Sequence, residues 1–199
     1  MKFILGKKLG MSQIFNENGK VVPITVILAE PMKATQVKTL EKDGYQAVQF
    51  GSGFRKKINK PLAGHLKDLG KFRHLKEQKG VGDFKVGDAV DVSVFSVGDV
   101  VKVSAISKGK GFQGAVKRHG FHGMPASHGH HHVLRHVGSI GQRFPQHTLK
   151  GMRMAGRMGG ERVSLRGLEI ISVDKDRSLL TVRGAVPGRK GALLEISGV

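Results

Sequence analysis

The longest acid-free stretch of the chain, residues 100–160, restricts its fold more than any other feature. These 61 residues contain no Asp or Glu, but they contain ten Lys or Arg, eight of the ten His and twelve Gly. After Ile106 they match neither the period of a helix nor the alternation of a strand for long. A structureless segment of this length is unusual inside a compact domain. We therefore predict that residues 107–160 form an extended loop that is anchored at both ends and does not fold on itself.

The charge of this stretch predicts a polyanionic partner. The chain has 34 Lys and Arg against 15 Asp and Glu, a formal net charge of +19, and about half of the excess lies within residues 100–160. Because like charges repel, such an excess is favourable where an opposite charge neutralises it. Nucleic acid is the leading candidate partner, and an anionic membrane surface is the second. Folded RNA fits best, since its phosphates can order a segment that lacks a hydrophobic core.

Glycines in the loop alternate with bulky apolar residues, whereas purely flexible linkers consist mainly of Gly and Ser. The bulky residues are Phe112, Phe121, Met124, Ile140, Phe144 and Met154. Glycine also lets the backbone approach a phosphate closely. A disordered basic loop that binds any anion is the alternative interpretation.

Residues on both sides of the loop have the pattern of short β-strands. Runs of β-branched residues, or alternation of apolar and polar residues, are separated by Gly and Asp turns. The predicted strands are residues 21–29, 45–50, 89–94, 101–105, 163–173, 178–183 and 193–197. We predict a mainly β fold with α+β elements, in which residues 1–106 and 161–199 form a small antiparallel β-barrel.

One short helical part is predicted near residues 59–79. Asn59 is a suitable N-cap, Pro61 suits the first turn, and Gly70 suits the end of a helix. Three leucines share one face of this helix: Leu62, Leu66 and Leu69. Residues 71–79 are a candidate for a further helical piece.

Residues 107–114 (SKGKGFQG) are similar to a phosphate-binding glycine loop. Their spacing is not that of a P-loop, and no strong helical pattern follows them. We interpret the segment as backbone amides and two lysines that pack against RNA phosphates. A flexible turn that leaves the barrel is the alternative.

Several histidines cluster between residues 128 and 136, and imidazoles can bind zinc. No carboxylate or thiolate lies nearby to complete or orient such a site, so we expect no metal and no other cofactor. Hydrogen bonds to phosphates and base edges are the favoured role.

No enzymatic constellation is found. Ser127 and His128 are sequence neighbours without an acid nearby, and Asp174 and Asp176 lack the rest of a calcium loop. The chain has no Cys, which excludes disulfides, and no run of about 18 apolar residues that would cross a membrane. We expect a cytoplasmic protein that is not an enzyme and has no membrane partner or small-molecule substrate.

Several blocks, in order along almost the whole chain, are similar to those of one protein family. They are LGKKLGMSQIF at 5–15, TQVK at 35–38, SKGKGFQG at 107–114, KRHGF at 117–121, PASHG at 125–129, GSIG at 138–141 and MAGRMG at 154–159. On these residues the chain resembles the bacterial-type ribosomal protein three of the large subunit. It departs from that pattern at Lys102, at Val137 and in the histidine run at 130–132.

The resemblance implies a translation-factor-like β-barrel with a long basic loop that penetrates ribosomal RNA (rRNA). It implies a structural constituent of the large ribosomal subunit that binds large-subunit rRNA directly, nucleates early assembly and orders RNA near the peptidyl-transferase centre. Neighbouring large-subunit proteins are further expected partners, and the ribosome is the expected location. The glutamine that matches Gln142 is methylated in some members of the family, so Gln142 is a candidate modification site. A generic basic nucleic-acid-binding protein and a barrel-based translation factor are the alternatives.

The residues predicted to bind RNA are cations and two histidines of the loop and its end. They are Lys108, Lys110, Lys117, Arg118, His119, His128, Arg135, Arg143, Lys150, Arg153, Arg157 and Arg162. Arginines would give forked, directional contacts, whereas lysines would act as mobile point charges.

Overall fold

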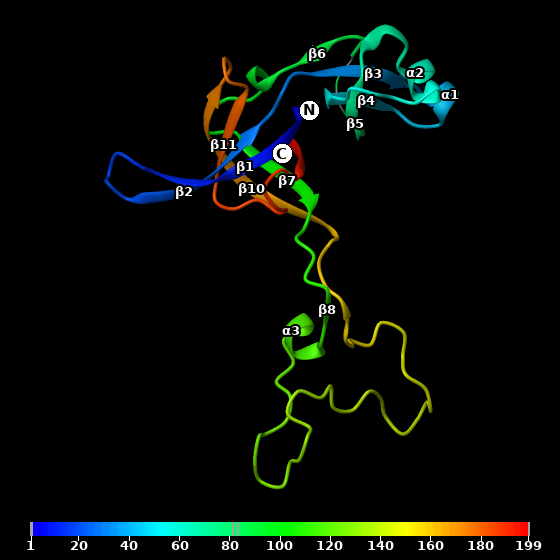
Figure 1. The fold of residues 1–199 in the computed structure, drawn as a ribbon, viewed down its shortest axis with the longest axis vertical. Coiled ribbons are helices and arrows are strands. Elements are labelled where there is room, and N and C mark those ends of the chain that lie inside the picture. The colour runs from blue at the N-terminus through cyan, green and yellow to red at the C-terminus, as the bar shows by residue number, and fades with distance from the viewer. Residues whose placement is uncertain (1, 81, 83, 199) are drawn as a thin grey trace. The chain divides into compact units, whose positions relative to one another are not determined.

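The computed structural model describes residues 2–80, 82 and 84–198, apart from the side chain of Asp68. The chain divides into two compact units (Figure 1). The globular unit consists of Met1–Ile106 and Arg162–Val199, and the second unit, Ser107–Glu161, is called the arm below. Among the described residues, no helix is long and apolar enough to cross a membrane.

Six antiparallel strands of the globular unit pair in a closed ring, in the order β1-β12-β7-β10-β11-β2 and back to β1. They are β1 (Phe3–Phe15), β2 (Val21–Leu28), β7 (Val100–Ile106), β10 (Arg162–Asp174), β11 (Leu179–Arg183) and β12 (Leu193–Gly198). Alternate residues of a strand point to opposite faces, and Val101, Val103 and Ala105 of β7 are accordingly buried. The prediction of a mainly β fold with antiparallel sheets is confirmed.

A four-stranded antiparallel sheet, in the order β5-β4-β3-β6, completes the globular unit. Its strands are β3 (Met32–Lys38), β4 (Ala47–Phe54), β5 (Phe72–Lys79) and β6 (Ala89–Val90). Phe50 of β4 packs against Phe3 of the ring, with ring centroids 5.6 Å apart, and against Phe84 at 5.4 Å. One hydrophobic core therefore runs through the ring and this sheet. Two short helices, α1 (Leu40–Asp43) and α2 (Lys60–Leu66), lie beside the sheet (Figure 1).

The predicted helix after Asn59 is present as α2, followed by a 3₁₀ turn, Lys67–Leu69, that ends at Gly70. Leu66 is fully buried, although the side chain of Asn59 makes no capping hydrogen bond. The prediction of a further helical piece at 71–79 is wrong, because these residues form strand β5. Its backbone pairs with β4 along its whole length, from Phe72 opposite Phe54 to Lys79 opposite Ala47. Sheet pairing here outweighs the local helical propensity of the charged residues.

The predicted strand at 89–94 is also partly wrong. Pairing with β3 ends at Val90, and a 3₁₀ turn, Val92–Val94, follows. The Asp91 carboxylate accepts a hydrogen bond from the backbone nitrogen of Ser93 at 2.8 Å. An Asp side chain that binds the backbone in this way favours a turn over a continued strand.

The arm contains only short elements: β8 (Phe112–Gln113), α3 (Ala115–His119) and β9 (Gly156–Arg157). It leaves the globular unit from β7 and returns in β10, and these two strands pair with Ile106 opposite Arg162. The five-residue helix α3 follows Gly114, where no strong helical pattern was expected. It is closed by Gly120, which adopts the left-handed conformation that commonly ends helices.

Candidate nucleic-acid interface

The two legs of the arm are joined to each other next to the globular unit. The backbone nitrogen of Ser107 donates to the carbonyl oxygen of Glu161 at 2.8 Å, and Lys110 donates to Met158 at 2.9 Å. Met158 in turn donates to Gly111 at 2.9 Å. Farther along, β8 and β9 pair with Phe112 opposite Arg157. The base of the arm is therefore a narrow antiparallel ladder rather than two independent chains.

Two features of this ladder depend on particular residues. Gly159 has a φ of +70°, and a β-carbon there would lie 2.1 Å from the carbonyl oxygen of Lys108. Only glycine fits this close approach of two backbones. Beyond the β8–β9 pair along the two legs, the Arg118 guanidinium donates to the carbonyl oxygen of Met154 at 2.8 Å, and His119 Nε2 lies 3.1 Å from the same oxygen. Arg118 and His119 thus connect α3 to the returning leg.

A backbone hydrogen bond also closes a loop in the distal part of the arm. The Met124 nitrogen donates to the carbonyl oxygen of Leu134 at 3.0 Å, which closes a loop that contains His128 and the histidine run at 130–132. His128 and His132 both have a positive φ, 61° and 56°. His128 is exposed, so its ring is accessible to a partner.

The arm buries almost none of its apolar side chains. The structure describes all of residues 107–161, and Ala115 is the only one of them that is buried. The bulky residues singled out from the sequence are half-buried or exposed, and Phe112 and Phe144 are 76% and 80% exposed. The arm therefore has no hydrophobic core to hold its course beyond the ladder.

The charges of the arm are unneutralised. None of the ion pairs formed by the described residues involves a residue of the arm. Eight of its predicted RNA-binding cations are exposed: Lys108, Lys110, Lys117, Arg135, Arg143, Lys150, Arg153 and Arg157. This arrangement presents positive charge to a partner along the whole segment.

Arg162, at the root of the arm in β10, has a different environment. It pairs with Glu195, which also binds the Lys76 ammonium at 3.0 Å. Burial raises the pKa of Glu195, but the hydrogen bonds from Lys76 and Arg162 outweigh burial, so the pKa is lowered overall. Arg162 is therefore partly neutralised within the globular unit.

Comparison with known proteins shows the family to which the chain belongs. The family model of Ribosomal protein L3 matches residues 83–181. The large ribosomal subunit protein uL3 of Herpetosiphon aurantiacus is 48% identical over 98% of this chain and 94% of its own length. The uL3 proteins of Corynebacterium jeikeium and Shouchella clausii are each 47% identical over 98% of this chain, and 93% and 96% of their own lengths are covered. The chain belongs to the uL3 family. It is a structural, non-enzymatic protein of the large ribosomal subunit, which confirms the family resemblance seen in the sequence.

Gln142, the candidate modification site of this uL3 chain, is exposed at the edge of a hollow of about 340 Å³. The hollow is lined by Ser139, Gly141, Gln142, Pro145, His147, Leu149 and Met152. The Ser139 hydroxyl donates to the carbonyl oxygen of Gly141 at 2.7 Å and fixes the backbone just before the glutamine. Among the described residues, no group of three or more His, Asp or Glu is arranged to hold a metal ion.

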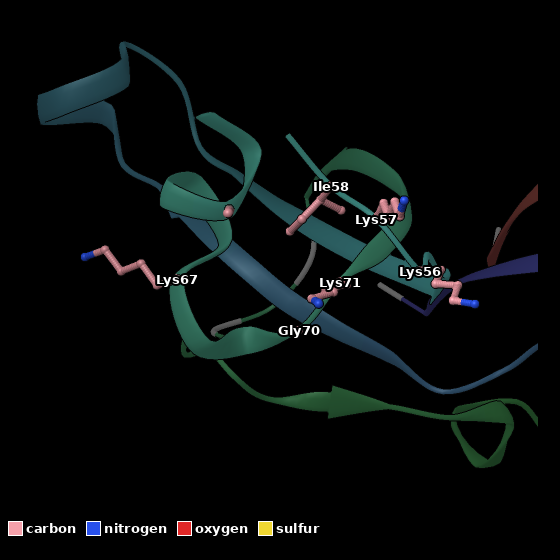
Figure 2. Close-up of a pocket in the computed structure, with 7 residues that line it drawn as sticks. Lys56, Lys57, Ile58, Lys67, Gly70 and Lys71 are labelled. Carbon is pink, nitrogen blue, oxygen red and sulfur yellow. The ribbon is translucent and has the colours of Figure 1, made fainter. Parts of the chain in front are cut away.

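A second basic region of this uL3 chain was not identified from the sequence. Lys56, Lys57, Lys67 and Lys71 line a hollow of about 540 Å³ beside α2 in the globular unit (Figure 2). The sequence signal was the run RKKINK at residues 55–60. It was overlooked because the charge excess of the arm is larger.

Proposed function

We propose that the arm binds large-subunit rRNA directly and becomes ordered on it. The observation that carries this proposal is the combination of exposed, unneutralised cations with a nearly complete lack of buried apolar residues in the same segment. A chain of this kind gains its ordering energy from phosphates rather than from its own core. The ladder at its base supports the proposal, because it holds the two legs together where Lys108, Lys110 and Arg157 lie.

The predicted RNA-binding residues take different parts in this proposal. The eight exposed cations of the arm contact phosphates, and His128 contacts a phosphate or a base edge. Arg118 and His119 act mainly by holding α3 to Met154, so they position the neighbouring Lys117. Arg162 contributes less to binding, since Glu195 already neutralises it in part.

We further propose that the strand ring is a small translation-factor-like barrel that serves as the rigid base of the arm. In this proposal the protein joins the large subunit early, contacts neighbouring ribosomal proteins, and orders RNA near the peptidyl-transferase centre through the arm. The hollow beside Gln142 would allow a modifying enzyme to reach the side-chain amide.

A salt titration of binding to protein-free large-subunit rRNA tests the role of the arm. The test variant replaces Lys108, Lys110, Lys117, Arg135, Arg143 and Arg153 by Gln in the full chain. If these six cations neutralise phosphates, the slope of log K against log salt becomes shallower by roughly 4–5. An unchanged slope would contradict the proposal. Weaker binding to random RNA than to rRNA by the wild-type chain would separate a specific module from a generic polycation.

A further inference from the structure

The second basic region lies in the globular unit, apart from the residues proposed to bind RNA. Lys56 and Lys57 come from the loop after β4, Lys67 follows α2, and Lys71 precedes β5. With Ile58, Ala63 and Gly70 they line the hollow described above. We call the four lysines the lysine surface.

The four lysines of the lysine surface have no carboxylate partner among the side chains that the structure describes. Some other cations of the globular unit are held by carboxylates, as in the pairs Lys38–Glu77 and Lys76–Glu195, both at 3.0 Å. None of the four lysines forms an ion pair with any residue that the structure describes with its side chain. Residues 55–71 contain six Lys and Arg and a single acid, Asp68. The local charge excess is therefore as unbalanced as that of the arm.

The directions of the side chains restrict what this surface can bind. Figure 2 shows the amine of Lys67 pointing away from the hollow on one side, and Lys56 and Lys57 lying on the other side. All four lysines are exposed. A single small anion would be held by amines that converge on one point, whereas amines spread along a surface match a series of charges. The geometry fits an extended polyanion.

The backbone of Lys67 supports a role for its side chain outside the fold. Lys67 has φ 48° and ψ −124°, a conformation that glycine adopts without strain and other residues rarely adopt. Lys67 lines the hollow, and its side chain is exposed and has no ion pair among the described residues. Lysine at this position gives the fold no visible advantage, but it adds a cation to the surface.

We propose that the lysine surface is a second docking site for rRNA, which contacts the phosphate backbone independently of the arm. This inference rests on the proposed function, because it assigns a further part of the same RNA partner to a new site. RNA is favoured over an acidic protein, since lysine is depleted in the cores of protein–protein interfaces and supplies many of the contacts to phosphate. Two separate anchor points would fix the orientation of the globular unit on the RNA.

The test uses the full chain and protein-free large-subunit rRNA. In one variant Lys56, Lys57, Lys67 and Lys71 are all replaced by Gln. The matched control replaces Lys20, Lys33, Lys175 and Lys190 by Gln, four exposed lysines that also lack ion pairs among the described residues. Both variants lose the same net charge. We expect the salt slope to become shallower by about 3 in the first variant and by less than about 1 in the control.

Hydroxyl-radical footprinting of the bound rRNA shows which nucleotides lose their contact with the protein in the variant. The lysine-surface variant should lose protection of one set of nucleotides and keep the set that depends on the arm cations. Equal slope changes in the variant and its control would show a general effect of charge and overturn the inference. The lysine-surface variant could instead bind rRNA as tightly as the wild-type chain but enter reconstituted subunits poorly. That outcome would indicate a protein partner and would also overturn the inference.

The arm variant, measured beside these two, separates this inference from the proposed function. If the salt slope becomes shallower in the arm variant but not in the lysine-surface variant, only the second docking site is refuted. If the salt slope becomes shallower in the lysine-surface variant but not in the arm variant, the role proposed for the arm is refuted and the second docking site is supported.

Discussion

The carbonyl oxygen of Lys108 lies so close to Gly159 that a β-carbon on Gly159 would approach it to 2.1 Å. The two residues belong to opposite legs of the arm and are separated by about fifty residues of chain. Their contact lies within the ladder that begins with Ser107 and Glu161. The ladder is the part of the arm whose structure is fixed by the protein itself.

Replacing Gly159 by Ala should open this ladder. The side chain would clash with a backbone oxygen and would also have to adopt a φ of +70°. We expect a local loss of about 2 kcal/mol, measured by faster hydrogen exchange of the Lys110 and Met158 amides. Exchange in the strand ring should not change. Gly109→Ala is the control, because no atom lies within 4 Å of its added β-carbon, and equal effects of the two substitutions would refute this prediction.

Replacing Lys8 by Met should destabilise the strand ring. The Lys8 ammonium is buried and donates to the carbonyl oxygens of Val186 at 2.7 Å and Gly188 at 3.2 Å. Since hydrogen bonds from a charged donor contribute about 1.5–3 kcal/mol, the free energy of unfolding should fall by about 3 kcal/mol. Chemical denaturation measures the effect, with Lys7→Met as the control because Lys7 is exposed. Similar losses in both variants would argue against a specific role for the ammonium.

The pairing of Glu195 predicts a dependence of stability on pH. Burial raises the pKa of Glu195, but the bonds from Lys76 and Arg162 lower it by more, so the folded pKa lies below the ordinary value of 4.5. The ionised carboxylate therefore stabilises the fold above pH 4.5, and this contribution is lost as the pH falls through the lowered folded pKa. Glu195→Gln should be less stable by about 1 kcal/mol at neutral pH.

Denaturant titrations of both chains between neutral and acidic pH check the Glu195 prediction. The difference between wild type and Glu195→Gln should shrink below pH 4.5. Glu30→Gln serves as the control, since Glu30 is exposed and forms no ion pair with the described residues. A difference that stays constant across the whole pH range would contradict the assignment.

Replacing Lys67 by Gly should stabilise the globular unit while weakening RNA binding. Glycine removes the strain of φ 48° and ψ −124°, so we expect a gain of about 1 kcal/mol in the free energy of unfolding. The salt slope for rRNA should become shallower by about 1, as for the loss of one phosphate contact. Opposite changes in stability and binding would identify Lys67 as a binding residue. A loss of both stability and RNA binding in this variant would assign Lys67 a structural role instead.

Residue patterns predicted the strands whose apolar residues alternate or cluster, such as β2, β7 and β12. Strand β1 was not recognised because Gly6, Lys7 and Lys8 interrupt its apolar run. The charged sequence of strand β5 predicts a helix, because its strand character comes from pairing with β4. Local sequence cannot report such a distant partner.

The position of the candidate site in the chain could be predicted from the sequence, but the contacts between its residues could not. The lack of acids located the arm, yet the ladder depends on contacts such as Phe112 with Arg157, which are far apart in the chain. Three residues predicted to bind RNA have partners within the protein: Arg118 and His119 at Met154, and Arg162 at Glu195. A cation in a sequence looks the same whether its partner is a phosphate, a carbonyl oxygen or a carboxylate.

Both ends of the arm are held by strands that pair with each other, with Ile106 opposite Arg162. The arm consequently has no free end, and it cannot be passed tip-first through a closed opening that is only one chain wide. Any RNA gap that receives it must admit two chains side by side, or must be completed around it afterwards. If the arm enters folded RNA as proposed, a gap only one chain wide would have to close around it after the protein has arrived, whereas a gap two chains wide could be complete beforehand.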